Sequence, residues 1–130
     1  GGITQARAIN YKGQIVGAGV QEGGGGFRAI LWNNGVAKNL DPLNSHRYSI
    51  AYGINFKGQV VGRAITTSGV QRAFLWQNDT MIDLNSLIPR NSGWELFSAA
   101  DINNRGQIVG HGKHNNQTRA FLLTPTWVTR

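Results

Sequence analysis

The sequence contains no cysteine, only three prolines and only six acidic residues among 130. The lack of cysteine excludes disulfide bonds, thiolate metal ligands and cysteine nucleophiles. No apolar run approaches the roughly 18 residues that a membrane-spanning helix requires, so we expect no membrane span. Eighteen glycines, by contrast, indicate many tight turns. This balance favours an all-β protein with short strands over a helical one.

The shortage of acidic residues leaves a formal charge of +7, because 13 lysines and arginines are spread along the chain without forming a block. Such a surface attracts anionic partners such as polyanionic sugars, lipid head groups or nucleic acid. The alternative is a solvated basic surface with no acidic ligand. Charge alone does not choose between them.

One motif occurs three times. Ile-Asn-x-x-Gly-Gln-(Ile/Val)-Val-Gly ends at positions 17, 62 and 110, and each copy is followed by Arg-Ala-(Ile/Phe)-Leu-(Trp/Leu) at 28–32, 72–76 and 119–123. The spacing of about 45 residues is typical of repeat architectures, in which neighbouring units complete each other's cores. We expect a single repeat domain over residues 1–130, with units at 3–44, 48–88 and 94–129.

Each unit divides into four strand-length apolar segments bounded by Gly, Asn or Asp. The tetrapeptides at 10–13, 55–58 and 103–106 place Asn first and Gly fourth, which predicts a type I turn followed by a bulge. The connection between the second and third segments varies in length, which indicates an exposed loop. We expect Gly69, in that loop, to tolerate substitution better than Gly58 in the turn.

Adjacent apolar residues, such as Val60 and Val61, point to opposite faces of a strand, so both faces of each sheet must be covered. Three antiparallel four-stranded repeats of this length predict the stacked blades of a β-propeller. A β-trefoil also contains three units of four strands and remains the alternative.

The combined motif resembles the HAF repeat, a family named for a His-Ala-Phe tripeptide and found in predicted extracellular bacterial proteins. The resemblance spans residues 6–125. Arginine stands at the histidine position in all three copies, and Ile30 replaces Phe in the first. The resemblance implies repeat blades and an extracellular or cell-surface location. It implies no catalytic residues.

Candidate ligand-binding residues recur at equivalent positions. They are the turn cations Lys12, Lys57 and Arg105, the arginines Arg28, Arg72 and Arg119 that open the third segment, and the non-repeating tryptophans Trp94 and Trp127. The cations would form a basic rim, the arginines would bind carboxylate or phosphate, and the tryptophans would stack on sugars. In the alternative interpretation, the cations are solvated turn tips, the arginines bond the Asn or a backbone carbonyl of the neighbouring strand, and Trp94 and Trp127 pack between units. Trp32 and Trp76 are expected to pack between units.

Catalytic and metal sites are not indicated. His111 and His114 lack a third ligand nearby, and the glycines at 23–26 lack the following Lys-Ser/Thr of a phosphate-binding loop. We therefore expect no enzyme activity, metal or cofactor. The leading hypothesis is a binding or structural module for carbohydrate or another polyanionic surface polymer. A non-specific nucleic-acid-binding protein is the second hypothesis, and an enzyme with its site in a central opening is the third.

The same architecture predicts self-association. Three stacked blades leave an apolar face at each end of the stack, and such faces favour a homodimer or larger assembly. Residues 126–129 are candidates for the fourth strand of the third unit, or alternatively for a strand that pairs with residues 3–5 to close a ring.

Overall fold

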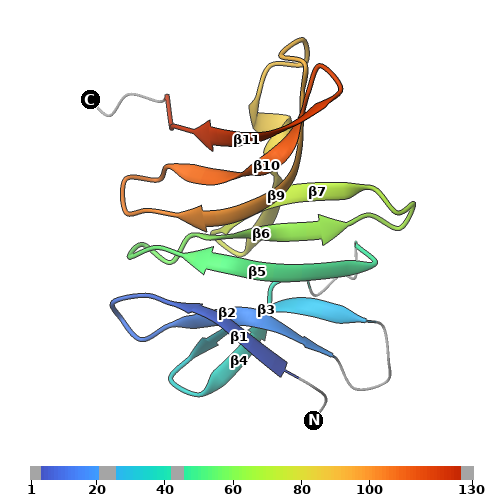
Figure 1. Ribbon diagram of the computed structural model, residues 1–130. Coiled ribbons are helices and arrows are strands. Elements are labelled where there is room, and N and C mark those ends of the chain that lie inside the picture. Colours follow the sequence, from blue (N-terminus) through green and yellow to red (C-terminus); the bar gives the residue numbers. More distant parts are fainter. Residues whose placement is uncertain (1–3, 21–25, 42–45, 127–130) are drawn as a thin grey trace.

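The computed structural model describes residues 4–20, 26–41 and 46–126, and these residues form three antiparallel sheets (Figure 1). The first sheet contains β1 (Thr4–Ile9), β2 (Ile15–Val20), β3 (Phe27–Asn33) and β4 (Val36–Asn39). The second contains β5 (Tyr48–Ile54), β6 (Val60–Ile65), β7 (Gln71–Gln77) and β8 (Thr80–Asp83). The third contains β9 (Trp94–Ile102), β10 (Ile108–His114) and β11 (Gln117–Leu123), and a short 3-10 helix, η1 (Leu84–Leu87), precedes it.

Each sheet is a meander in which strands adjacent in sequence are paired, so the all-β class and the antiparallel pairing are confirmed. The expectation of four strands in every unit is wrong for the described part of the third unit, which contributes three. Of the proposed fourth-strand residues, only Thr126 is described and it lies outside any strand, while 127–129 lie outside the described residues. No helix within the described ranges is long and apolar enough to cross a membrane.

The first turn of each unit forms as the sequence predicts. In the second unit the Gly58 N–H donates to the carbonyl oxygen of Asn55 at 3.0 Å, and Gly58 adopts a φ of 82°. The equivalent glycines of the other units have φ values of 81°. Gly69 also has a positive φ, 92°, and closes its own turn through a bond to Thr66. The expectation that Gly69 tolerates substitution better is therefore not supported by its geometry.

A β-bulge lies in the strand that precedes each turn, and it explains the second glycine of the motif. The register of β5 against β6 shifts between Ala51 and Gly53, which brings the β5 backbone close to Gly62. A Cβ on Gly62 would lie 2.0 Å from the carbonyl oxygen of Ile50, and Gly17 and Gly110 face equivalent overlaps. The motif thus requires glycine here because backbone occupies the place of a side chain.

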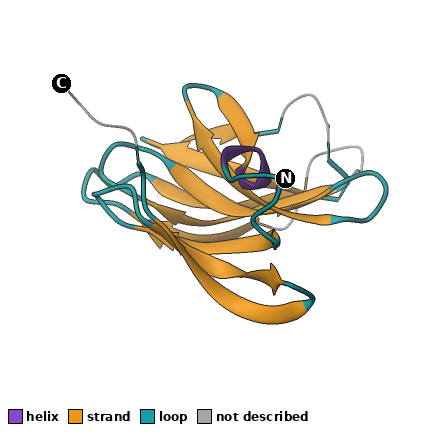
Figure 2. Ribbon diagram, turned by 90° about the horizontal axis from the view of Figure 1, so that it is seen from above, coloured by secondary structure: helices purple, strands orange, loops and turns teal. Residues whose placement is uncertain are grey.

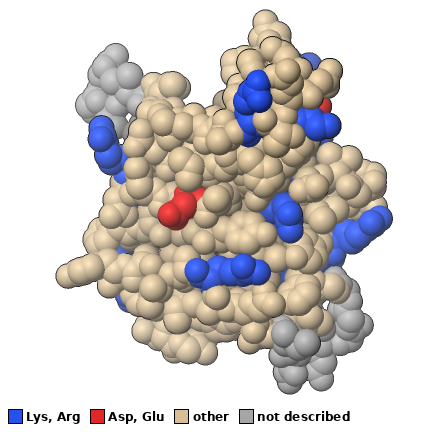
Figure 3. All heavy atoms as spheres, in the orientation of Figure 1, with Lys and Arg blue, Asp and Glu red and all other residues tan. Residues whose placement is uncertain are grey.

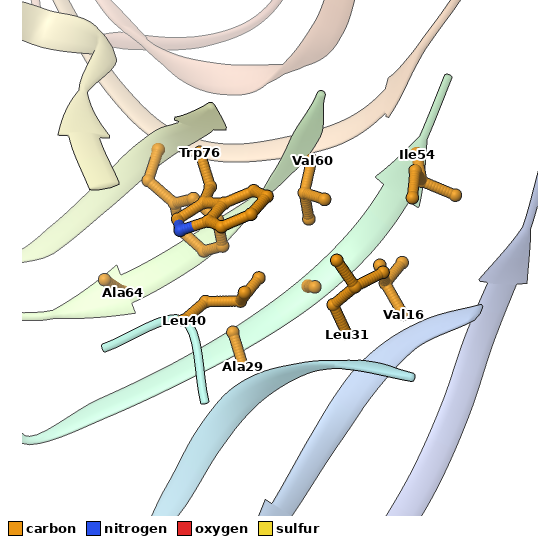
Figure 4. Close-up of a cluster of buried hydrophobic side chains, with 10 residues drawn as sticks. Val16, Ala29, Leu31, Leu40, Ile54, Val60, Ala64 and Trp76 are labelled. Carbon is orange, nitrogen blue, oxygen red and sulfur yellow. The ribbon is translucent and has the colours of Figure 1, made fainter. Parts of the chain in front are cut away.

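The sheets stack, so each has a front face toward the following sheet and a back face toward the preceding one. β5 lies against β2 and β3, and β9 lies against β6 and β7 in the same way. The first interface joins front residues Val16, Ala29, Leu31 and Leu40 to back residues Ala51, Ile54, Val60, Ala64, Phe74 and Trp76 (Figure 4). The second joins Val61, Ala73, Leu75 and Leu84 to Leu96, Ala99, Ile102, Ile108 and Phe121.

The two interfaces use the same repeat positions. Val16 and Val61 are equivalent, as are Leu31 and Leu75, and all four are buried on front faces. A β-trefoil would require strands of all three units to join one closed barrel, whereas the described strands form three separate sheets. The trefoil alternative therefore does not describe this arrangement.

The two repeat tryptophans differ in burial. Trp76 is buried between the first and second sheets, as expected. Trp32 is equivalent in sequence but only half-buried, because it lies on the back face of the first sheet. The first sheet packs against Trp76, but within the described ranges no sheet packs against Trp32 in the same way. Equivalent sequence positions thus become inequivalent at the end of the stack.

Candidate functional site

The three first turns of the units lie together along one side of the molecule. These turns, at residues 10–13, 55–58 and 103–106, are called the turn row here. They lie at the left in Figure 1, and Figure 2 shows the connecting loops overlying one another on the same side. The fold thus brings the equivalent members of this expected site to one side of the molecule.

An asparagine ladder holds the turn row in register. The Asn10 side-chain Nδ2 donates to the backbone carbonyl oxygen of Asn55 at 3.0 Å, and the Asn55 Nδ2 donates to that of Asn103 at 3.1 Å. Each asparagine also orders its own turn. The Oδ1 of Asn55 accepts from the backbone N–H groups of Lys57 and Gln59, and its Nδ2 donates to the Gln59 Oε1 at 2.7 Å.

The second residue of each turn projects an aromatic or polar side chain outward. Tyr11 is 92% exposed and Phe56 is 46% exposed, and their ring centroids lie 6.3 Å apart. The third unit has Asn104 at this position, and its Oδ1 accepts from the Phe56 backbone N–H at 2.7 Å. The turn row therefore presents two neighbouring rings and an amide.

The third residue of each turn is basic and exposed in all three units: Lys12, Lys57 and Arg105. The Lys12 Nζ lies 4.8 Å from the centroid of the Phe56 ring, in a cation–π contact that joins the first and second turns. Figure 3 shows Lys and Arg side chains spread over the face it views, with few acidic ones among them. Cations beside exposed rings suit a ligand that offers both negative charge and flat apolar surface.

The arginines that open the third strand lie at the opposite end of the strands from the turn row. Arg28 pairs with Gly19 in register, four residues from the pair Ile15–Trp32 beside the turn, which corresponds to about 13 Å along the strand. The fold therefore does not bring Arg28, Arg72 and Arg119 together with the turn cations.

These arginines also have three different surroundings. Arg28 is buried, and its NH1 donates to the carbonyl oxygens of Phe27 and Arg47. The Arg72 Nε lies 3.8 Å from the Asp83 carboxylate. Arg119 is exposed and donates to the Thr118 carbonyl oxygen. They do not form three equivalent forks, and Arg28 is engaged as the backbone-bonding alternative expects.

Trp94 is half-buried at the start of β9 in the third sheet, where its ring stacks on His114 at 4.7 Å between centroids and meets Phe121 edge-on. It helps to line a shallow apolar hollow of about 250 Å³ along β11, with Ile88, Leu96 and Leu122 among the other lining residues. Trp94 is thus separated from the turn row by the length of its sheet's strands. Trp127 lies outside the described residues.

The described ranges contain no group of three His, Cys, Asp or Glu side chains arranged to hold a metal. Asp41 is buried, and its Oδ2 lies 3.3 Å from the His46 Nδ1. The same oxygen accepts from the His46 backbone N–H at 3.2 Å. This pair joins the two ends of the connection between the first and second units.

Two features of the structure were not anticipated from sequence. One is the exposed pair Tyr11 and Phe56, whose shared turn position could have drawn notice. The other is Arg63, whose Nε is buried without a hydrogen-bond partner in the described part of the chain. Arg63 stands where the other units have Ala18 and His111, so the repeat pattern carried no signal for it.

Comparisons of the chain with protein-family models, curated proteins and solved structures found no significant match.

Proposed function

We propose that the protein is a non-catalytic binding or structural repeat module whose sheets act as the blades of a propeller-like assembly. The packing of β5 and β9 supports this, because the first strand of each of these sheets contacts the second and third strands of the preceding sheet. The resemblance of the motif to the HAF repeat adds a bacterial, extracellular or cell-surface setting to the proposal.

The proposed ligand is a carbohydrate or another polyanionic surface polymer, bound along the turn row. The observation that carries this proposal is the asparagine ladder, because it aligns three equivalent exposed cations on one side of the molecule. A polymer with regularly spaced negative charges can meet several of them at once, so weak contacts add along one chain. The rings of Tyr11 and Phe56 supply flat surfaces for the apolar faces of sugar rings.

The test compares two triple variants on a heparin column and on arrays of acidic glycans. One variant changes Lys12, Lys57 and Arg105 to Gln. The control changes Lys38, Arg90 and Lys113 to Gln, which removes the same charge from exposed positions outside the turn row. We expect the turn-row variant to elute at clearly lower salt than the control. Elution of the two variants at the same salt concentration would mean that retention depends on net charge alone and not on the turn row.

A nucleic-acid-binding function is the second candidate, because exposed rings beside cations can also stack on bases and contact phosphates. It predicts affinity for single-stranded DNA that falls steeply with salt and is indifferent to sequence. Tight DNA binding without any glycan binding would favour this candidate over the first.

A further inference from the structure

The two ends of the stack carry the same residue positions that form the two internal interfaces. The front face of the third sheet bears Val109 and Leu122, equivalent to Val61 and Leu75 of the second sheet. Val61 and Leu75 are 0% and 8% exposed, whereas Val109 and Leu122 are 44% and 59% exposed. The third sheet thus presents an uncovered copy of a face that is buried twice elsewhere in the chain.

The back face of the first sheet is likewise exposed, although the equivalent back faces of the other two sheets are buried. Ile54 and Ile102 are buried against the preceding sheets, but their equivalent Ile9 is 65% exposed. Ile15, Ile30 and Trp32 lie on the same face and are only half-buried, whereas Val60, Phe74 and Trp76 at the same positions of the second sheet are buried. One end of the stack is therefore an unmatched front face and the other an unmatched back face.

The asparagine ladder ends in the same complementary way. Asn10 and Asn55 each donate to the carbonyl oxygen of the equivalent asparagine in the following sheet. The Nδ2 of Asn103 bonds the Gln107 Oε1, and within the described ranges no following sheet offers it a carbonyl. At the other end, the Asn10 carbonyl oxygen accepts the N–H of Gly13 in its own turn, and no preceding sheet in the described ranges offers it a second donor. The Asn55 carbonyl oxygen, by contrast, also accepts from the Asn10 side chain.

We infer that a second copy of this chain docks head to tail, with its Ile9 and Trp32 face on the Val109 and Leu122 face of the first copy. The contact repeats the internal interfaces, and the Asn103 Nδ2 donates to the carbonyl oxygen of Asn10 in the second copy. A second copy is the occupant that the structure argues for, because its back face carries the residues that this front face already binds twice. Two copies joined at both ends would stack six sheets with no open face, within the range of closed propellers.

The proposal makes the interface heterologous, since two different surfaces meet. That property gives a sharp test, because a substitution on one surface and a substitution on the other must complement each other. Leu122→Asp places a charge on the front face, and Ile9→Asp places one on the back face. Both sites are largely exposed in the single chain, so each variant should keep its own fold, checked by circular dichroism.

The experiment measures the mass of the full 130-residue chain by light scattering over a range of concentrations. The wild type is expected to reach at least twice the 14.2 kDa of one chain, and each variant alone is expected to stay at 14.2 kDa. An equimolar mixture of the two variants should again give a two-chain species through its one intact interface. Val36→Asp, at an exposed position of the first sheet outside both end faces, should behave as the wild type.

Three results would overturn the inference. The first is a wild-type protein that stays at the mass of one chain at the highest concentration measured. The second is association that survives Leu122→Asp or Ile9→Asp, which would show that other surfaces meet. The third is a mixture of the variants that remains monomeric, because the intact front face of one variant should still bind the intact back face of the other.

Discussion

Asn55 and Asn103, 48 positions apart in sequence, are joined by a hydrogen bond from the side-chain Nδ2 of the first to the backbone carbonyl oxygen of the second. Asn10 makes the same bond to Asn55. The residue that closes a turn within one sheet therefore also fixes the position of the next sheet. One side chain thus couples local structure to the stacking of the repeats, and through it to the alignment of the turn row.

We predict that Asn55→Ala destabilises the fold by about 2–3 kcal/mol, because it removes the buried amide oxygen that accepts from the N–H groups of Lys57 and Gln59 and also breaks the ladder bond to Asn103. Asn103→Ala should cost about 1 kcal/mol, since Asn103 is exposed and its side chain bonds only its own turn. Urea unfolding in the Leu122→Asp background, where the end face cannot pair, measures both. Equal losses would mean that the ladder adds nothing to stability.

A second prediction separates two kinds of glycine in the motif. Gly62→Ala should destabilise severely, by more than about 3 kcal/mol, because the new Cβ would overlap the Ile50 backbone at 2.0 Å and the bulge could not form. Gly58→Ala should cost about 1–2 kcal/mol, since only its positive φ is strained and the nearest atom lies 3.7 Å away.

Gly58→Asn serves as the control for this comparison, because asparagine tolerates a positive φ better than alanine does. It should recover part of the loss at position 58, measured by thermal unfolding. The same replacement at position 62 should recover nothing. Similar stabilities for the two alanine variants would show that the bulge adapts to a side chain.

The sequence predicted the features that depend on residues close together in the chain. The Asn-x-x-Gly turns, the opposite-facing pair Val60 and Val61 and the antiparallel meanders all follow from local pattern, and all three appear in the structure. The expected packing between units is borne out for Trp76.

Features that depend on how units sit against each other could not be predicted in the same way. The ladder bond from Asn10 to Asn55 requires a particular rotation and offset between sheets, which no single unit encodes. Trp32 and Trp76 are identical in pattern, yet they differ in burial because only one has a sheet against it. The positive φ of Gly69 arises in a loop whose length varies, so the other copies carried no information about it.

A third prediction addresses the ring pair of the turn row. Tyr11→Ala should change stability by less than about 0.5 kcal/mol, because the side chain is almost fully exposed. It should weaken the binding of an acidic glycan that the wild type binds by about 3- to 10-fold, since an aromatic contact contributes about 0.5–1.5 kcal/mol. Isothermal titration with a heparin oligosaccharide measures the change, and Tyr11→Phe should bind nearly as the wild type. Unchanged binding in the alanine variant would remove the ring from the site.

The final prediction uses Trp32 as a reporter of the uncovered back face. In a variant that keeps Trp32 and replaces the other three tryptophans with Phe, iodide should quench fluorescence more at low protein concentration than at high. Head-to-tail docking buries the face that holds Trp32, so association shields the ring from the quencher.

A matched variant that keeps only Trp76 should show weak quenching at every concentration, because Trp76 is already buried inside one chain. Adding Leu122→Asp to the Trp32 variant should abolish the concentration dependence, although Leu122 lies at the opposite end of the same chain. A substitution at Leu122 can expose Trp32 only if the two end faces meet between copies. If quenching of Trp32 still depends on concentration in the Leu122→Asp background, the proposed contact is contradicted.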